Sequence, residues 1–203
     1  MPNPTPRRRD AAVTREAILL SARKVFAQSG YDAVGLPEIA AGAGVTAMLI
    51  NRYFDSKEQL FAEVLADTLA SPMTLTPDNL SAENLGRTLA TALVSIDEAG
   101  STPLEGFLIL LHSASSQRAA AIGREQLEKG QQASLAAALT GAHHEERAAL
   151  VMALVSGFQV MRQRLELAAL TRADPQVLID LLAPLFQQLV GGNDGRSRVA
   201  MLP

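Results

Sequence analysis

The chain of 203 residues has no cysteine, no tryptophan and only three histidines. The absence of cysteine excludes disulfides, thiolate metal sites and thiol redox sensing. No stretch approaches the roughly 20 uninterrupted apolar residues that a membrane span needs, and no apolar segment of signal-peptide length follows the N-terminal arginines. We therefore expect a soluble, cytoplasmic protein with no membrane partner.

Aromatic residues are scarce, at 4% of the chain, whereas 48% of the residues are hydrophobic and many of these are Ala and Leu. This composition, with no convincing strand pattern, favours an all-α fold of one or two domains. The net charge is −3, which argues against general affinity for nucleic acid. However, residues 1–60 carry eight Lys and Arg against six Asp and Glu, and the remainder carries ten against fifteen. Any nucleic-acid binding is therefore expected in the N-terminal part.

Residues 30–61 predict two short helices around a glycine turn, followed by the start of a third helix. The first helix begins near Pro37, which suits a first helical position, with Gly35 or Leu36 as its cap. Two glycines then break the pattern, and Thr46 has a hydroxyl that can cap the second helix. This arrangement is the outline of a DNA-reading helix-turn-helix.

Helical spacing in the second helix places Ile50 and Phe54 on an inward face. The same spacing turns outward Ala47, Met48, Asn51 and Arg52. Asn can pair with adenine, Arg can pair with guanine or phosphate, and Met or Ala can pack on a thymine methyl group. The outward face therefore has the chemistry for direct reading of a DNA groove.

The third helix starts at residues 55–58, where Asp55 or Ser56 can cap and Glu58 can complete a capping box. Lys57 lies against the positive end of this helix dipole. That placement is unfavourable unless an anion shares the site, and a DNA phosphate would be such an anion. The alternative is a solvated lysine without a binding role.

The residues that carry a family resemblance lie between Thr14 and Phe61. They are Phe26, Gly30-Tyr31, Ile39-Ala40, Ala43-Gly44-Val45-Thr46, Tyr53-Phe54, Ser56-Lys57-Glu58 and Leu60-Phe61. With these residues the segment resembles the N-terminal DNA-binding domain of the TetR family of bacterial repressors. It departs from the family pattern at Pro37, where many members carry a basic residue, at Gly35, in place of a Ser or Thr cap, and at Asn51, in place of a common tyrosine.

The resemblance implies a role for individual residues and double-stranded DNA as the partner. The residues that match phosphate-holding positions are Thr46, Tyr53 and Lys57, and those that match positions facing the major groove are Ala47, Met48, Asn51 and Arg52. We also expect DNA contacts from Thr14 and Arg15, where the match begins.

Four regions are expected along the chain: a disordered basic arm at 1–12, the helix-turn-helix domain at 13–60, a larger helical domain for effector binding and dimerisation at 61–190, and a disordered tail at 191–203. The arm contains three prolines and the run Arg7, Arg8 and Arg9. It would add salt-dependent affinity by lying in the minor groove or on phosphates. Its alternative role is that of a solubilising tail.

The C-terminal domain is predicted to consist of helices at about 79–98, 103–114, 117–139, 145–171 and 175–190. The last two carry apolar stripes that contain Leu150, Leu154, Gly157 and Leu165, and Leu178, Leu181, Leu182, Leu185 and Leu189. These stripes form either an intrachain core or a four-helix dimer interface. The resemblance favours a homodimer, which would place its reading helices on the half-sites of a palindromic operator, roughly 34–36 Å apart or a multiple of that distance.

The resemblance also implies a pocket for a small apolar or amphipathic effector among the middle helices. The candidate lining residues are Phe107, Leu111, His112, Met152, Phe158 and Met161. Methionines suit an adaptable apolar pocket. Each of these residues has an ordinary core role as its alternative, and His112 would then be bonded to a backbone carbonyl.

Two enzyme-like patterns fail on context. Residues 42–47 fit the dinucleotide fingerprint G-x-G-x-x-A by letter, but that motif needs a preceding strand, and the preceding residues predict helix. His143 and His144 lack the spacing of a zinc-binding helix. We therefore expect no catalytic residue, no metal site and no cofactor.

The sequence thus predicts a DNA-binding repressor that a small ligand releases. The alternatives are an activator, a regulator without ligand control, and a helical small-molecule-binding or enzymatic protein.

Overall fold

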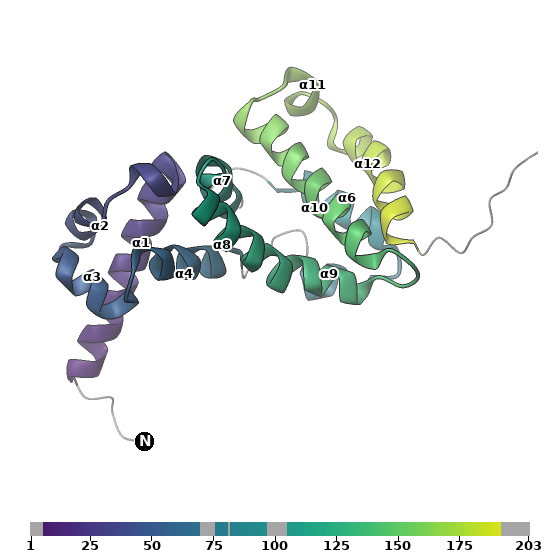
Figure 1. Cartoon of the computed structure of the whole chain (residues 1–203). Helices are drawn as coiled ribbons and strands as arrows, with labels where there is room; N and C mark the ends of the chain where they lie inside the picture. The colour runs from purple at the N-terminus through teal and green to yellow at the C-terminus, as the bar shows by residue number, and fades with distance from the viewer. Residues whose placement is uncertain (1–5, 70–75, 81, 97–104, 192–203) are drawn as a thin grey trace, which may run out of the picture. The chain divides into compact units, whose positions relative to one another are not determined.

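The computed structural model describes residues 6–69, 76–80, 82–96 and 105–191, and all regular structure in these ranges is helical (Figure 1). This confirms the expected all-α class. The chain divides into two compact units, of which the first combines residues 1–71 with 104–128 and the second combines 72–103 with 129–203. Within the described residues, no helix is both long enough and apolar enough to span a bilayer.

The first unit contains the N-terminal helices and two helices from the middle of the chain. Their bounds are α1 Pro6–Ala33, α2 Leu36–Ala43, α3 Ala47–Phe54, α4 Lys57–Leu69, α7 Glu105–Ser113 and α8 Gln117–Leu127. In this unit α7 packs on α1, and α8 packs on α4. The division therefore differs from the expected boundary at residue 60, because the first unit continues along α4 and includes α7 and α8.

The expected N-terminal arm is helical from Pro6 onward, so the backbone of Arg7, Arg8 and Arg9 is part of α1. The prediction of a broken, disordered arm up to residue 12 is wrong for this stretch. Proline is well accommodated in the first turn of a helix, where its missing N–H has no intrahelical partner. Residues 1–5 lie outside the described part of the chain.

Four of the eight aromatic residues of the chain are buried in the core of the first unit. The Phe26 and Phe61 ring centroids are 5.1 Å apart in an edge-to-face arrangement, and those of Tyr31 and Phe61 are 4.9 Å apart. Phe26 and Phe61 are fully buried, as is Ile109 of α7. Burial of each large apolar side chain contributes about 1.5–3 kcal/mol, so the rings, with α7 against them, fix the frame that carries α2 and α3.

Gly30 lets α1 change direction before its last turn. Its backbone has φ +73° and ψ −177°, which residues with a side chain rarely adopt. A Cβ built on Gly30 would lie 2.3 Å from the carbonyl oxygen of His112 in α7. Immediately after it, the Tyr31 N–H donates to the Ser113 hydroxyl at 3.0 Å. The kink and the α1–α7 packing therefore depend on each other.

We expect Gly30→Ala to lower the free energy of unfolding by at least about 2 kcal/mol, because strain at positive φ adds to the clash with α7. Gly130→Ala is the matched control, since no atom lies within 4 Å of its built Cβ and its φ is not positive. Thermal unfolding of both variants measures the difference. Equal stability of Gly30→Ala and the unmodified protein would contradict this account of the kink.

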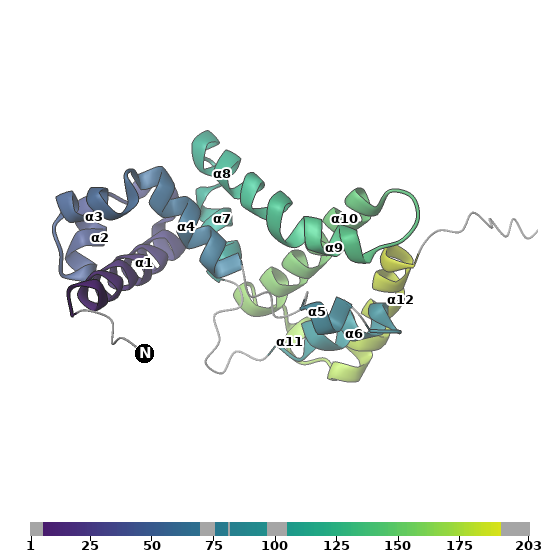
Figure 2. The ribbon, with the colours of Figure 1, turned by 90° about the horizontal axis from the view of Figure 1, so that it is seen from below.

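The second unit has its own core. Its elements are α5 Pro77–Leu80, α6 Leu85–Val94, α9 Ala133–Ala138, α10 His144–Gln159, the π-helical turn η2 Val160–Arg164, α11 Ala168–Thr171 and α12 Pro175–Val190, and the π-helical turn η1 Glu128–Gln132 leads into α9. Figure 2 gives a second view of these helices. α6 and α12 pack closely, because a Cβ on Gly86 would lie 2.7 Å from the Gln187 backbone nitrogen.

Buried Arg147 holds together the end of this unit. Its guanidinium donates to four backbone carbonyls, those of Thr140, Ala142, Leu189 and Val190. Two of these acceptors are in the last turn of α12, where helix carbonyls have no intrahelical partner. The arginine therefore caps α12 and closes the turn before α10.

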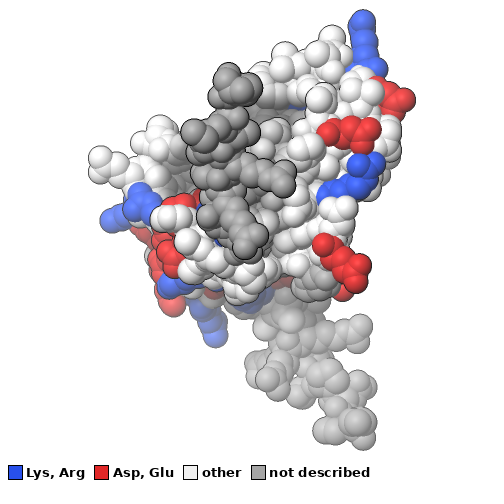
Figure 3. All heavy atoms as spheres, turned by 90° about the vertical axis from the view of Figure 1, so that its right-hand side faces the viewer, with Lys and Arg blue, Asp and Glu red and all other residues white. Residues whose placement is uncertain are grey.

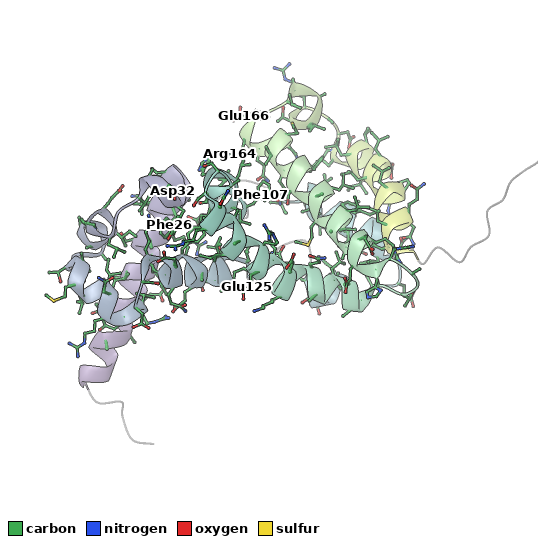
Figure 4. All side chains as sticks on the ribbon, in the orientation of Figure 1. Phe26, Asp32, Phe107, Glu125, Arg164 and Glu166 are labelled. Carbon is green, nitrogen blue, oxygen red and sulfur yellow. The ribbon has the colours of Figure 1, made fainter. Side chains whose placement is uncertain are left out.

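The helix predictions for this half are confirmed in outline, but two of the expected helices are interrupted. The expected helix at 79–98 is two helices, α5 and α6, and residues 97 and 98 lie outside the described ranges. The expected helix at 145–171 is interrupted after η2, where Glu166 has φ +49°; Figure 4 labels Arg164 and Glu166 at this point. The helix at 175–190 has the predicted bounds. Of the tail expected at 191–203, all but Gly191 lies outside the described residues.

Candidate nucleic-acid interface

The turn between α2 and α3 is built by glycine and threonine. Gly44, with φ +67°, ends α2 in the left-handed conformation, and its N–H donates to carbonyls of the preceding turn. The Thr46 hydroxyl accepts the Leu49 N–H at 3.3 Å and caps α3, as predicted. Gly35 is the residue before α2 and makes no side-chain cap. The turn is therefore fixed by local hydrogen bonds.

The inner face of α3 anchors it to the first unit. Ile50 and Phe54 are buried together with Ile39 of α2, as the helical spacing predicted. Tyr53 is half-buried, with its ring centroid 6.5 Å from that of Phe54. A helix fixed along one side presents its other side rigidly.

The outer face of α3 carries three of the four residues that were predicted to read the groove. Met48 is 79% exposed, and Asn51 and Arg52 are also exposed. Ala47 differs, because it is half-buried and packs against the core. An exposed methionine has no packing role within the described chain, so this face is suited to contact another molecule.

Lys57 and Glu58 form the first turn of α4. The Ser56 hydroxyl accepts the Gln59 N–H at 3.1 Å, so Ser56 is the cap and the expected capping box with Glu58 is not formed. The Glu58 carboxylate instead accepts a hydrogen bond from Arg118 of α8. The Lys57 ammonium lies 4.2 Å from the centroid of the Tyr31 ring.

The titration of this cluster follows from these contacts. A hydrogen bond from its own backbone N–H, together with Arg118, lowers the pKa of Glu58, so the carboxylate is ionised near neutral pH. Burial, and then the charge of Glu58, raises the pKa of Tyr31, so its hydroxyl stays protonated near neutral pH. Lys57 therefore lies beside a fixed negative charge and a neutral ring.

The residues near the N-terminus that were predicted to contact DNA lie in different surroundings. Arg15 forms an ion pair with Glu63 of α4, and its guanidinium lies 4.9 Å from the Phe54 ring centroid. These contacts give Arg15 a role in holding α1 to α3 and α4. Thr14 is half-buried on α1. The structure does not describe the side chains of the three arginines at 7–9.

The residues predicted to line an effector pocket fall on the two compact units. Phe107, Leu111 and His112 are on α7 of the first unit, and the other three lie on α10 and η2 of the second: Met152, Phe158 and Met161. The His112 Nδ1 lies 2.7 Å from the Ala27 carbonyl oxygen, so the alternative of a carbonyl-bonded histidine holds. Met152 and Phe158 pack against the second core, whereas Met161 is exposed.

The residues predicted to form a dimer interface divide into exposed and buried sets. Four leucines are 47–65% exposed: Leu150 on α10, Leu165 just after η2, and Leu181 and Leu185 on α12. Leu178 and Leu182 are instead buried in the intrachain core, and Leu154 and Leu189 pack against it. The built Cβ of exposed Gly157 meets no atom within 4 Å. The side of the molecule that carries α12 in Figure 1 is shown in Figure 3, where most of the described surface is uncharged.

Two enzyme-like patterns of the sequence, a metal site and a dinucleotide fingerprint, can be compared with the described ranges. No group of three or more His, Asp or Glu side chains converges there on a possible ion site. The G-x-G-x-x-A letters at residues 42–47 follow helix α2, and Gly44 serves to end that helix. His143 is exposed at the start of α10, with its Nδ1 3.8 Å from a Glu146 oxygen.

Three features define a helix-turn-helix DNA-binding protein. They are a capped turn between two short helices, a rigid second helix with an exposed outer face, and a lysine at the N-terminus of the next helix. Two family models match the chain: "Bacterial regulatory proteins, tetR family" at residues 18–64 and "Tetracyclin repressor-like, C-terminal domain" at residues 83–190. The second match alone covers more than half of the sequence. The chain belongs to the TetR family of DNA-binding transcriptional regulators and is not an enzyme.

Two curated relatives each match about a quarter of the chain. The transcriptional repressor BepR of Brucella suis is 45% identical over 56 residues, which are 28% of this chain and 27% of BepR. The transcriptional activator FasR of Mycolicibacterium smegmatis is 41% identical over 51 residues, which are 25% of this chain and 23% of FasR. The chain thus spans only about a quarter of the length of each of these relatives.

Solved structures extend the similarity to most of the chain. A TetR-family regulator from Streptomyces coelicolor A3 is 26% identical with a TM-score of 0.55, over 88% of this chain and 95% of that chain. NalD of Pseudomonas aeruginosa, the secondary repressor of the MexAB-OprM multidrug efflux pump, is 19% identical with a TM-score of 0.58, over 87% and 96%. At this identity the NalD comparison shows the shared fold alone.

Proposed function

We propose that this regulator is a cytoplasmic, homodimeric repressor that binds a palindromic operator and is released by a small apolar or amphipathic molecule. The observation that carries the DNA-binding part is the exposed face of α3, with Met48 at 79% exposure beside Asn51 and Arg52. The repressor role draws on BepR, which is named as a repressor. Because FasR is named as an activator, activation is the alternative sign of regulation.

In the proposed complex, α3 lies in the major groove, and phosphates are held at its two ends. Thr46 and Tyr53 would contact phosphates at the ends of α3. Lys57 would contact a third phosphate at the N-terminus of α4, where the helix dipole also favours an anion. Thr14, Arg15 and the arginines at 7–9 are proposed as further contacts, and Arg15 would have to exchange its pairing with Glu63. Ala47 would approach the groove with the part of its methyl group that remains exposed.

Dimerisation is proposed through the exposed leucines of α10 and α12. These helices pack on each other within the second unit, and both carry apolar side chains that the described chain leaves uncovered. Burial of such side chains against a second copy is favourable by about 25 cal/mol for each Å² of apolar surface. The open space around Gly157 would admit the backbone of a partner helix.

Release by a ligand is proposed through the second unit, where the candidate contacts are Met152, Phe158 and Met161. Within the first unit, the candidates are Phe107, Leu111 and His112 of α7. A ligand that moves a switch from 1:99 to 99:1 has to favour one state by about 5.5 kcal/mol. Bound compounds therefore have to be tested for their effect on operator affinity and not for occupancy alone.

The phosphate contacts are tested by salt dependence. We expect the double variant Tyr53→Phe with Lys57→Ala to bind operator DNA more weakly. The plot of log K against log salt should be shallower by about one unit, because the Lys57 charge is lost, whereas loss of the neutral Tyr53 hydroxyl lowers affinity without changing the slope. Lys24→Ala, which removes an exposed lysine of α1, is the control and should retain the slope. A double variant with the affinity and slope of the unmodified protein would remove these phosphate roles.

A further inference from the structure

Arg118, which belongs to α8 and lies far along the chain from the helix-turn-helix, contacts the first turn of α4. Its guanidinium donates to the Glu58 carboxylate, whose charge also raises the pKa of the Tyr31 hydroxyl. The Tyr31 ring in turn lies against the Lys57 ammonium, 4.2 Å from it. All four side chains belong to the first compact unit. Arg118 thus pairs with the carboxylate of the residue next to Lys57.

A carboxylate beside a phosphate-binding lysine opposes DNA binding in two ways. It repels the phosphate, because adjacent residues on a helix turn lie well within the Debye length of about 10 Å at 0.1 M salt. It also attracts the lysine ammonium and so competes with the phosphate for it. Arg118 donates to a Glu58 oxygen, and its guanidinium offsets the charge of the carboxylate. Lys57 then remains the uncompensated charge of this turn.

The ion pair contributes little to folding. The Arg118 side chain is 70% exposed and that of Glu58 is 34% exposed, and exposed pairs contribute at most about 1 kcal/mol to stability. The packing of α8 rests instead on its buried side, where a Cβ on Gly123 would lie 2.4 Å from the Leu110 side chain of α7. Substitution of Arg118 therefore changes the charge near Lys57 and leaves the fold intact.

We propose that Arg118 is a positioning residue for DNA binding, which neutralises and holds Glu58 so that Lys57 is available to a backbone phosphate. This inference rests on the proposed phosphate role of Lys57. It assigns a determinant of DNA affinity to α8, outside the helix-turn-helix motif.

The test is a double-mutant cycle with the full-length protein and a duplex carrying its selected operator. We expect Arg118→Ala to weaken binding about two- to fivefold at 0.1 M salt, the size of an exposed charge interaction. The same substitution should have no measurable effect in a Glu58→Gln background, because no carboxylate remains to be neutralised. Arg118→Lys should restore most of the affinity. Arg124→Ala, on the same helix and with the same change in charge, is the matched control and should bind like the unmodified protein.

The outcomes distinguish failure of this inference from failure of the proposed phosphate role of Lys57. If Arg118→Ala weakens binding equally with Glu58 and with Gln at position 58, Arg118 acts as an independent charge, and the inference is overturned. If Arg118→Ala and Arg124→Ala behave alike, it is overturned as well. If Lys57→Ala leaves affinity and salt slope unchanged, the phosphate role of Lys57 fails first. Thermal unfolding of each variant, expected within a few degrees of the unmodified protein, shows that binding and not folding has changed.

Discussion

Replacement of Leu181 by Glu is expected to dissociate the proposed dimer. Leu181 is 65% exposed at the middle of α12, on the same side of that helix as Leu185. In a two-fold interface the substitution is present in both subunits, so two carboxylates would be buried without partners. We expect the dimer dissociation constant to rise at least about a hundredfold, which corresponds to about 2.7 kcal/mol, as measured by sedimentation equilibrium.

Operator affinity should fall when the dimer dissociates. Two reading helices on one rigid dimer bind two half-sites in a single event, and a monomer has to bind each half-site separately. Leu20→Glu is the matched control for the oligomeric state, because Leu20 is 56% exposed on α1 of the other unit. A Leu181→Glu variant that remains dimeric at micromolar concentration would assign the exposed leucines of α12 to some other contact.

The second large effect is expected on the outer face of α3. Arg52→Ala and Asn51→Ala should each weaken binding to the selected operator by about 1–3 kcal/mol, because a bidentate contact between side chain and base is lost. Each variant should also tolerate substitution at one base pair of each half-site that the unmodified protein requires. Binding to a panel of operators with single base changes measures both effects.

The pattern of loss identifies the kind of contact. Loss of discrimination at one position marks a base contact, whereas uniform weakening on all operators with a smaller salt slope marks a phosphate contact. Uniform weakening by both variants would contradict base reading by α3. Glu38→Ala, an exposed change on α2, controls for general effects of the helix pair.

The features that the sequence predicted well are those set by neighbouring residues. Gly44 ends α2 and Thr46 caps α3 through contacts within a few residues, so composition and spacing suffice to place them. The inward side of α3 follows in the same way from helical periodicity at Ile50 and Phe54.

The features that were missed depend on contacts between distant parts of the chain. Glu58 was expected to cap α4 and instead pairs with Arg118, which is 60 residues away. The inclusion of α7 in the first unit depends on its packing on α1 and on the bond from Tyr31 to Ser113. Local patterns carry no information about such pairings.

The apolar stripe of α12 shows a second limit of periodicity. Spacing placed Leu178, Leu181, Leu182 and Leu185 in one set, but the helix is apolar around much of its circumference. Packing of α6 and α10 on α12 buries Leu178 and Leu182 and leaves Leu181 and Leu185 exposed. Only the tertiary partner decides which side of such a helix is covered.

The central claim is that this regulator reads a two-fold symmetric DNA site as a dimer. The most direct test is selection of bound sequences from a random duplex library with the purified protein at near-physiological salt, followed by the stoichiometry on the selected site. The account predicts a palindrome whose half-sites lie about one helical turn, roughly 34–36 Å, or a multiple of that apart, bound by two chains or by four. Binding that depends on salt but not on sequence would contradict it.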